Sequence, residues 1–309
     1  MPERDERMNK MSEKNTQASS ENLKQVKGRS LGQETLRRLM KNKGAIVGMC
    51  FLLLLVIVAI ASEFIFDFDK DIILVQAENS FAPPSLQHIF GCDQSGRDIF
   101  ARILYGARYS LIIGIGSVAI GLFFGLILGS LAGFYGGVVD NLVMRANDIL
   151  YSIPNIMIAV VVVSIFGTST TSLLFSLSIS AASSFSRITR AAVMQVRGME
   201  YIESAYAMGL PTWKVILRHI IPNCLSPIIV QVTLAVGNNI ISASSLSFLG
   251  VGIPVPLPEW GAMLAEGRNY IRSAPWMCIF PGLAIMLTVL ALNLMGDGLR
   301  DALDPKLKK

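Results

Sequence analysis

The feature that most constrains this chain is a set of long segments without a single charged side chain. The first of these uncharged runs covers residues 44–62, and another, residues 149–186, contains 38 residues. A helix of about 20 apolar residues is long enough to cross the roughly 30 Å hydrocarbon core of a bilayer. Only 16% of the residues are charged, against about a quarter in soluble domains. We therefore predict an all-α integral membrane protein rather than a soluble enzyme.

The uncharged runs predict six transmembrane helices. Besides the two runs named above, the candidates are the apolar centre of the second run and two later runs: 110–134, 219–258 and 273–296. Run 149–186 is nearly twice the length that one span needs, so it must turn. We expect the turn at 167–172, where a glycine and several hydroxyl residues satisfy exposed backbone groups. Pro154 should kink the third helix, either to shape a pathway or to help packing.

The distribution of basic residues predicts the orientation of the chain. Residues 1–43 contain eleven Lys or Arg against six acidic residues, and 187–218 contain five against two. In 63–108 the balance reverses, with seven acidic and four basic residues. Because basic segments stay in the cytoplasm, both termini should be cytoplasmic, which agrees with an even number of spans.

Four regions follow from this pattern. Residues 1–30 are polar, lack a signal-type apolar stretch, and are expected to form a disordered cytoplasmic tail. Residues 31–66 should contain an amphipathic segment and the first span. The amphipathic part is either an interface-lying helix or a positively charged flank that fixes topology. Residues 67–108 are predicted to form an extracytoplasmic loop, and residues 109–309 a core of five spans.

The sequence lacks the motifs of an enzyme or a self-powered carrier. It has no Gly-Lys dipeptide for a phosphate-binding loop, no HExxH and no zinc-type Cys/His spacing. His88 and His219 fall on opposite predicted sides of the membrane, so we expect no metal site and no catalytic residue. The serines of 176–186 should let helices approach closely rather than catalyse a reaction.

Charged residues that could lie within the bilayer are few. The candidates Asp140, Arg145 and Asp148 fall near the cytoplasmic end of the third helix. They are either functional or form an Arg–Asp pair and helix-end caps at the water boundary. No energy source is evident in this chain, so a separate motor must drive it unless it merely conducts or scaffolds.

The segment 198–222 is the most informative part of the chain. A short helix over 200–208 should end at Gly209, which suits a helix C-terminal cap, and Pro211 should open a second short helix. The resulting hairpin would lie across the cytoplasmic face. Small residues beside Glu203 suit insertion into a groove on another protein.

This segment resembles the EAA loop of ABC-importer permeases. The family pattern is Glu-Ala-Ala, three residues, Gly, nine residues and Ile-x-Leu-Pro. Matching residues, with Ser in place of the second family residue, are Glu203, Ser204, Ala205, Gly209 and Pro222. His219 and Ile221 are further mild departures. The resemblance implies that this loop is the coupling helix that docks into an ATPase subunit. Glu203 would pair with a basic ATPase residue there, or otherwise remain a solvated helix charge.

Other segments resemble permeases of the dipeptide/oligopeptide (peptide/nickel) transport family. The similar segments are 90–111, 247–271, 280–305 and, as in the C-type partner of the permease pair, 36–49. The resemblance implies a type I ABC-importer permease fold in a bacterial inner membrane and a pathway for di- or oligopeptides. Nickel or glutathione import is the alternative.

The resemblance also implies partners for this chain. They are a second permease, two ATPases that bind ATP and Mg²⁺, and an extracytoplasmic solute-binding protein. Contacts with lipid but not with nucleic acid are expected, and no cofactor on this chain. Within the 250–271 loop, Trp260, Gly261 and Glu266 are candidates for docking the binding protein. Cys92 and Cys278 are both predicted outside, where a disulfide is conceivable.

Overall fold

The computed structural model describes residues 31–303, so the predicted tail 1–30 lies outside the described residues. Apart from one isolated bridge between Cys92 and Asp98, the regular structure in this part is helical. The principal helices are α2 (Leu31–Leu39), α3 (Lys43–Ile65), α4 (Ile99–Tyr135), α5 (Gly137–Ser152), α6 (Asn155–Phe166), α7 (Thr170–Arg197), α8 (Glu200–Ala207), α9 (Thr212–Val215), α10 (Ile221–Phe248), α11 (Trp260–Gly267) and α12 (Trp276–Leu303). Single helical turns occupy Phe68–Ile73, Ala77–Asn79, Ile216–Ile220 and Arg268–Tyr270.

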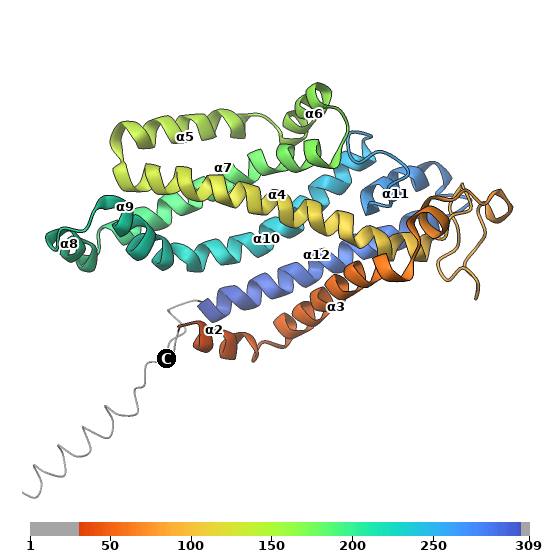
Figure 1. Cartoon of the computed structure of the whole chain (residues 1–309), viewed down its shortest axis with the longest axis horizontal. Coiled ribbons are helices and arrows are strands. Elements are labelled where there is room, and N and C mark those ends of the chain that lie inside the picture. Colours follow the sequence, from red (N-terminus) through yellow and green to blue (C-terminus); the bar gives the residue numbers. More distant parts are fainter. Residues whose placement is uncertain (1–30, 304–309) are drawn as a thin grey trace, which may run out of the picture.

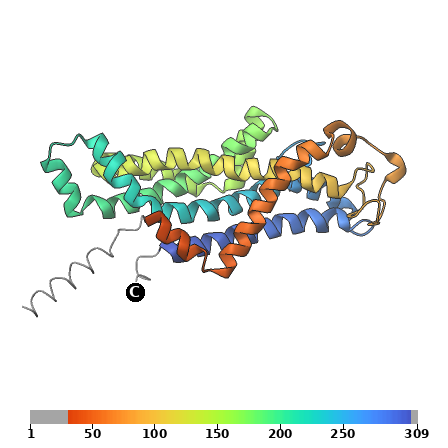
Figure 2. The same cartoon turned by 60° about the horizontal axis from the view of Figure 1, so that its bottom comes forward.

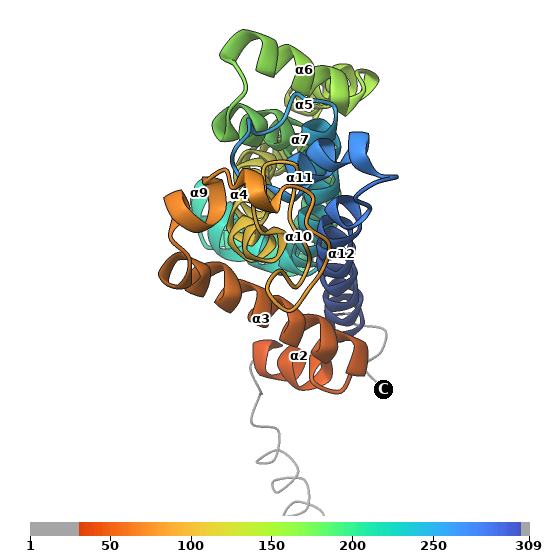
Figure 3. The same cartoon turned by 90° about the vertical axis from the view of Figure 1, so that its right-hand side faces the viewer.

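The long helices lie side by side in an elongated bundle (Figure 1). The α8–α9 hairpin projects from one end, which we call the hairpin end; α11 and the segment 66–98 form the opposite end, the far end. Seen along the bundle, α5 and α6 lie on one flank and α2 and α3 on the other (Figure 3). Helix α3 crosses the bundle obliquely and packs on α12 and α4 (Figure 2).

Four helical segments of the described chain are long and apolar enough to cross a membrane: Lys43–Ile65, Ile99–Tyr135, Thr212–Phe248 and Trp276–Leu303. A fifth span arises if α5 and α6, which meet at 89°, are counted as one broken helix. Helix α7 is 28 residues long but rich in serine, and it would complete the six. The total of six therefore stays a prediction.

The helix breaks follow local sequence signals. The bend between α5 and α6 lies at Ile153 and Pro154, where the sequence predicts a kink. The predicted turn at 167–172 is confirmed: Gly167 has a φ of +80°, and the Ser169 hydroxyl accepts the Ser172 N–H at the start of α7. Both breaks thus occur where the backbone loses helical hydrogen bonds.

Helix α4 begins earlier than the sequence suggests. The predicted extracytoplasmic loop ended at residue 108, but residues 99–108 form the first turns of α4. The Asp98 carboxylate caps this helix by accepting the Ala101 N–H at 3.0 Å. Because this segment contains Arg102 and Arg108, the uncharged run in the sequence begins only after it.

Helices α4 and α7 form the most extensive helix contact of the bundle, through glycines spaced four residues apart: Gly121, Gly125, Gly129 and Gly133. A Cβ added at Gly125 would lie 2.4 Å from the Cβ of Phe185, so there is room only for hydrogen. This spacing is typical of helices that pack closely in membranes. Ser186 of α7 is buried at this contact, beside Gly125 and Gly129, which agrees with the close helix approach expected of this serine.

Candidate functional site

The hairpin α8–α9 has the turn that the sequence predicts. Gly209 has a φ of +77°, a conformation that glycine adopts without strain. Its N–H donates to the Tyr206 carbonyl at 2.8 Å, and the Leu210 N–H donates to the Ala205 carbonyl at 3.2 Å. These two bonds close a helix end of the Schellman type. Pro211 then starts the second arm as expected.

The inner side of the hairpin is part of the hydrophobic core. Ile202, Ala205 and Val215 are buried and pack with Val193 of α7 and Ile220 at the start of α10. Because packed cores transmit displacement rather than absorb it, a force on the hairpin would move α7 and α10. The hairpin is therefore packed firmly against α7 and the start of α10.

The outer side of the hairpin exposes large apolar side chains. Met208 is 74% exposed, Trp213 60% and Leu217 59%. Exposed apolar groups of this size, gathered on one projection, are typical of protein-docking surfaces. Trp213 and Leu217 are four residues apart and so lie on one helix face, but the sequence alone does not show that this face is exposed.

The predicted coupling residues take different places in this hairpin. Glu203 is exposed, and its carboxylate makes no hydrogen bond or ion pair with other described residues. Ser204 is also exposed, and its hydroxyl donates to the Glu200 carbonyl at 3.0 Å. Gly209 lies at the exposed turn. Ala205 faces the core, and Pro222 lies in the first turn of α10. Glu203, Ser204 and Gly209 are thus exposed on the hairpin, whereas Ala205 is buried on its inner side.

The charged residues of α5 are mostly paired with α7. Asp140 forms an ion pair with Arg190, and Asp148 accepts a hydrogen bond from Arg187 at 2.9 Å. Arg145 is exposed. These contacts support the interpretation of Asp140 and Asp148 as partners in Arg–Asp pairs.

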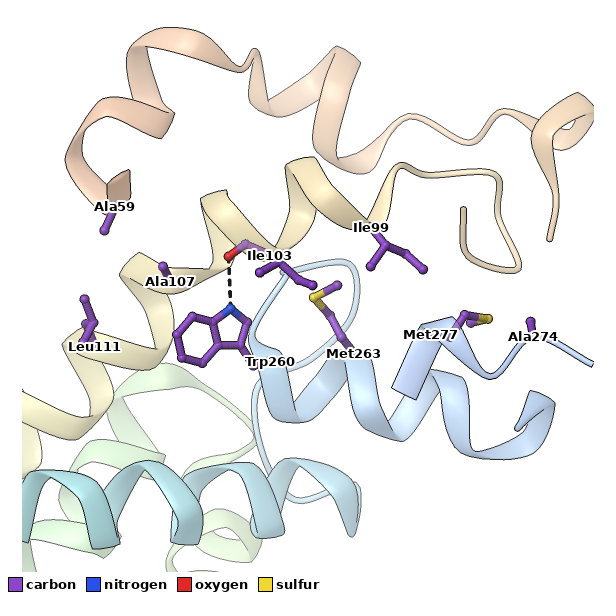
Figure 4. Packing of buried hydrophobic residues seen from close by; sticks show 9 residues of the cluster. All are labelled: Ala59, Ile99, Ile103, Ala107, Leu111, Trp260, Met263, Ala274 and Met277. Carbon is purple, nitrogen blue, oxygen red and sulfur yellow. Dashed lines mark hydrogen bonds between the residues drawn. The ribbon is translucent and has the colours of Figure 1, made fainter. Parts of the chain in front are cut away.

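At the far end, Trp260 is a core residue (Figure 4). Its side chain is 0% exposed, and its indole N–H donates to the Ile103 carbonyl of α4 at 3.0 Å. Gly261 lies against α10, where an added Cβ would be 2.4 Å from the Ser244 Cα. Both residues hold α11 onto the bundle.

Glu266 belongs to a buried ion network. Its carboxylate accepts hydrogen bonds from Arg97 at 2.8 Å and Arg102 at 3.1 Å, and Asp93 also pairs with Arg97 at 2.6 Å. Two positive and two negative charges are thereby balanced inside the far end. We expected Trp260, Gly261 and Glu266 on a docking surface, but all three face inward here, so they would support such a surface rather than form it.

The two far-end cysteines, Cys92 and Cys278, are both free thiols in this structure. The Cys92 carbonyl accepts the Trp276 indole N–H at 3.0 Å. Burial, aided by the negative charges of Asp98 and Asp93, raises the pKa of the Cys92 thiol to about 11. Among the described residues no three His, Cys, Asp or Glu side chains are grouped as metal ligands would be.

The described chain thus combines a bundle of long apolar helices with a projecting hairpin that exposes large apolar side chains. The family model described as the binding-protein-dependent transport system inner membrane component matches residues 121–309. The model of the N-terminal TM domain of oligopeptide transport permease C matches residues 30–84. The chain belongs to this family of ABC-transporter permeases, and is thus a multi-pass membrane protein.

Relatives and solved structures agree with this assignment. The chain is 44% identical to the dipeptide transport system permease protein DppC of Alkalihalophilus pseudofirmus, over 89% of this chain and 90% of the relative. It is also 44% identical to the glutathione transport system permease protein GsiD of Pectobacterium atrosepticum, over 89% and 91%.

The inward-facing MetNI methionine ABC transporter shares the fold, with a TM-score of 0.55 at 18% identity over 66% of this chain and 96% of that one. The predicted fold class, a type I ABC-importer permease, is confirmed.

Proposed function

We propose that this chain is one of two permease subunits that form the translocation pathway of an ATP-driven importer for di- and oligopeptides. The observation that carries the proposal is the 44% identity, over almost the whole length, to a permease named for dipeptide transport. The match of residues 30–84 to oligopeptide permease C supports the C-type position in the pair.

In this proposal the α8–α9 hairpin is the coupling helix. Its apolar tip and the unpaired carboxylate of Glu203 suit a groove of an ATPase with a basic residue nearby. ATP and Mg²⁺ would be bound by two partner ATPases, and closure of those subunits would push the buried inner side of the hairpin. The push would shift the permease pair between inward- and outward-facing states.

The remaining partners follow from the same proposal. The hairpin end, which α2 and the end of α12 approach (Figure 1), would face the cytoplasm together with both termini. The far end would receive an extracytoplasmic solute-binding protein that delivers the peptide. The second homologous permease would complete the pathway.

Glutathione is a second candidate substrate, favoured by the 44% identity to a glutathione permease. Glutathione is itself a tripeptide, so a pathway that accepts short peptides offers it the same amide groups. The two substrates therefore need to be separated by experiment.

The test is transport by the complete assembly. The chain, its partner permease, the ATPases and the binding protein are reconstituted in proteoliposomes, and uptake of a labelled dipeptide, glutathione and Ni²⁺ is measured with and without ATP. We expect ATP-dependent uptake of the dipeptide that requires the binding protein. Uptake of Ni²⁺ alone, or uptake without ATP, would contradict the proposal.

A further inference from the structure

A polar hollow of about 180 Å³ lies between α5, α6, α7 and α10. Its polar lining consists of amides, hydroxyls and a phenol: Tyr151, Asn155, Ser180, Ser183, Ser184, Gln231, Asn238 and Asn239. No lining residue in the described chain carries a charge. The hollow is thus polar and electrically neutral.

The lining residues repeat with the period of a helix. On α10, Gln231, Ala235 and Asn238 are spaced four and three residues apart, and on α7 Ser180 and Ser184 are four apart. Each set therefore lies on a single face of its own helix. They lie within one or two turns of the midpoints of these 28-residue helices. In a helix that spans a bilayer, the midpoint lies where the bilayer is most apolar.

Two of these amides have no partner in the described protein. Asn238 is exposed and Gln231 is half-buried. The side-chain amide of neither residue makes a hydrogen bond with another described residue. An unpaired amide is costly in hydrocarbon because no water replaces the missing hydrogen bonds. The face that carries Gln231 and Asn238 therefore does not face lipid tails.

Neighbouring polar groups are held in place. Asn239 donates to the Ser117 hydroxyl at 2.7 Å, and Ser180 donates to the Asn155 side-chain carbonyl at 3.0 Å. These bonds fix the wall of the hollow and leave the amides of Gln231 and Asn238 available to a ligand.

We propose that this neutral amide face is the wall of the substrate pathway and that Gln231 and Asn238 bind the main chain of a short peptide in transit. A carboxamide offers one acceptor and two donors, which match the N–H and C=O of a peptide bond whatever its side chains. A wall without charge has no electrostatic preference among peptides of different net charge. This inference rests on the proposed function and deepens it.

The test places a charge on this wall without changing its shape. Asn238→Asp is made in the complete transporter in proteoliposomes, and uptake of alanyl-lysine and alanyl-glutamate is measured with one and the same binding protein. We expect the ratio of cationic to anionic peptide uptake to rise about thirtyfold over wild type. Charges about 4 Å apart in water interact by ~1 kcal/mol, so the new carboxylate attracts the cationic peptide and repels the anionic one by about fivefold each. Gln231→Glu makes the same change seven residues earlier on the same face of α10 and is used if the first variant does not assemble.

The matched control is Asn141→Asp, the same change at an exposed amide of α5 outside the hollow. We expect it to leave the uptake ratio at the wild-type value. If Asn238→Asp and Gln231→Glu assemble and the uptake ratio is unchanged, the inference is overturned and the proposed function stays intact. This result is expected if the partner permease covers this face. Equal shifts in the Asn141→Asp control would also overturn the inference. Failure of the wild type to take up either peptide would instead overturn the proposed function and this inference with it.

Discussion

Gly209 shows how one residue sets the geometry of the hairpin. Its φ of +77° is closed to most side chains, although no atom lies within 4 Å of the position a Cβ would take. Backbone conformation, and not crowding, therefore selects glycine there.

We expect Gly209→Ala to strain the turn by about 1 kcal/mol and to weaken coupling. Binding-protein-stimulated ATP hydrolysis by the assembled transporter should fall about fivefold, a loss that corresponds to ~1 kcal/mol, while the chain still inserts in the membrane. Gly198→Ala is the control, because Gly198 also has free space around it but an ordinary φ of −83°. Equal stimulation in both variants would show that the turn does not set coupling.

Cys92 offers a test of the far end by pH. With its pKa raised to about 11, only about one thiol in a thousand is ionised at pH 8, and the thiolate is the reactive form. Since ionisation grows tenfold per pH unit below the pKa, labelling should remain negligible through neutral pH. We expect no maleimide modification of Cys92 at pH 7.5 in the folded transporter, and full modification after denaturation, by mass spectrometry. Rapid labelling of the folded protein would mean that the far end opens.

At the scale of helices, the α4–α7 contact is the most extensive one in the bundle. Gly125→Ala should destabilise the protein by about 2 kcal/mol, since the clash with Phe185 outweighs a gain of about 1 kcal/mol in helix propensity. Gly237→Ala gains the same propensity with its nearest neighbour 3.6 Å away, and should be neutral or stabilising. Thermal unfolding of the purified complex measures the difference; matching melting temperatures would argue against the close α4–α7 packing.

The ion network tests how α11 is held at the far end. Glu266→Ala leaves buried Arg97 and Arg102 without one of their carboxylate partners, so we expect a loss of about 3 kcal/mol. Lys70→Ala breaks a pair whose side chains are 79% and 50% exposed, and should change stability by less than about 1 kcal/mol. Denaturant unfolding compares the two variants, and a Glu266→Ala protein as stable as wild type would disprove the stabilising role of the network.

At the scale of the molecule, local signals predicted most of the fold. The uncharged run 44–62 became α3 (Lys43–Ile65), and Gly209 with Pro211 predicted the hairpin turn. Helix breakers and apolar segments are each made of residues that are continuous in the chain, so they can be recognised in a single sequence.

Long-range contacts explain what the sequence could not predict. The start of α4 was missed because the charge of Arg102 is balanced by Glu266, 164 residues away in the chain. Trp260 was expected outside for the same reason: its partner, the Ile103 carbonyl, is 157 residues away. The apolar tip of the hairpin could not be predicted either, because the sequence does not show that Met208 and Trp213 are exposed in the folded protein.

The central claim, that an ATPase works this permease through the hairpin, is tested most directly by photocross-linking in intact cells. A photoreactive amino acid is placed at Trp213 on the hairpin tip, and, as a control, at Val75, which is 64% exposed at the far end. We predict that position 213 captures a nucleotide-binding subunit of the transporter and that position 75 does not. Capture of that subunit at position 75, or none at position 213, would contradict the account.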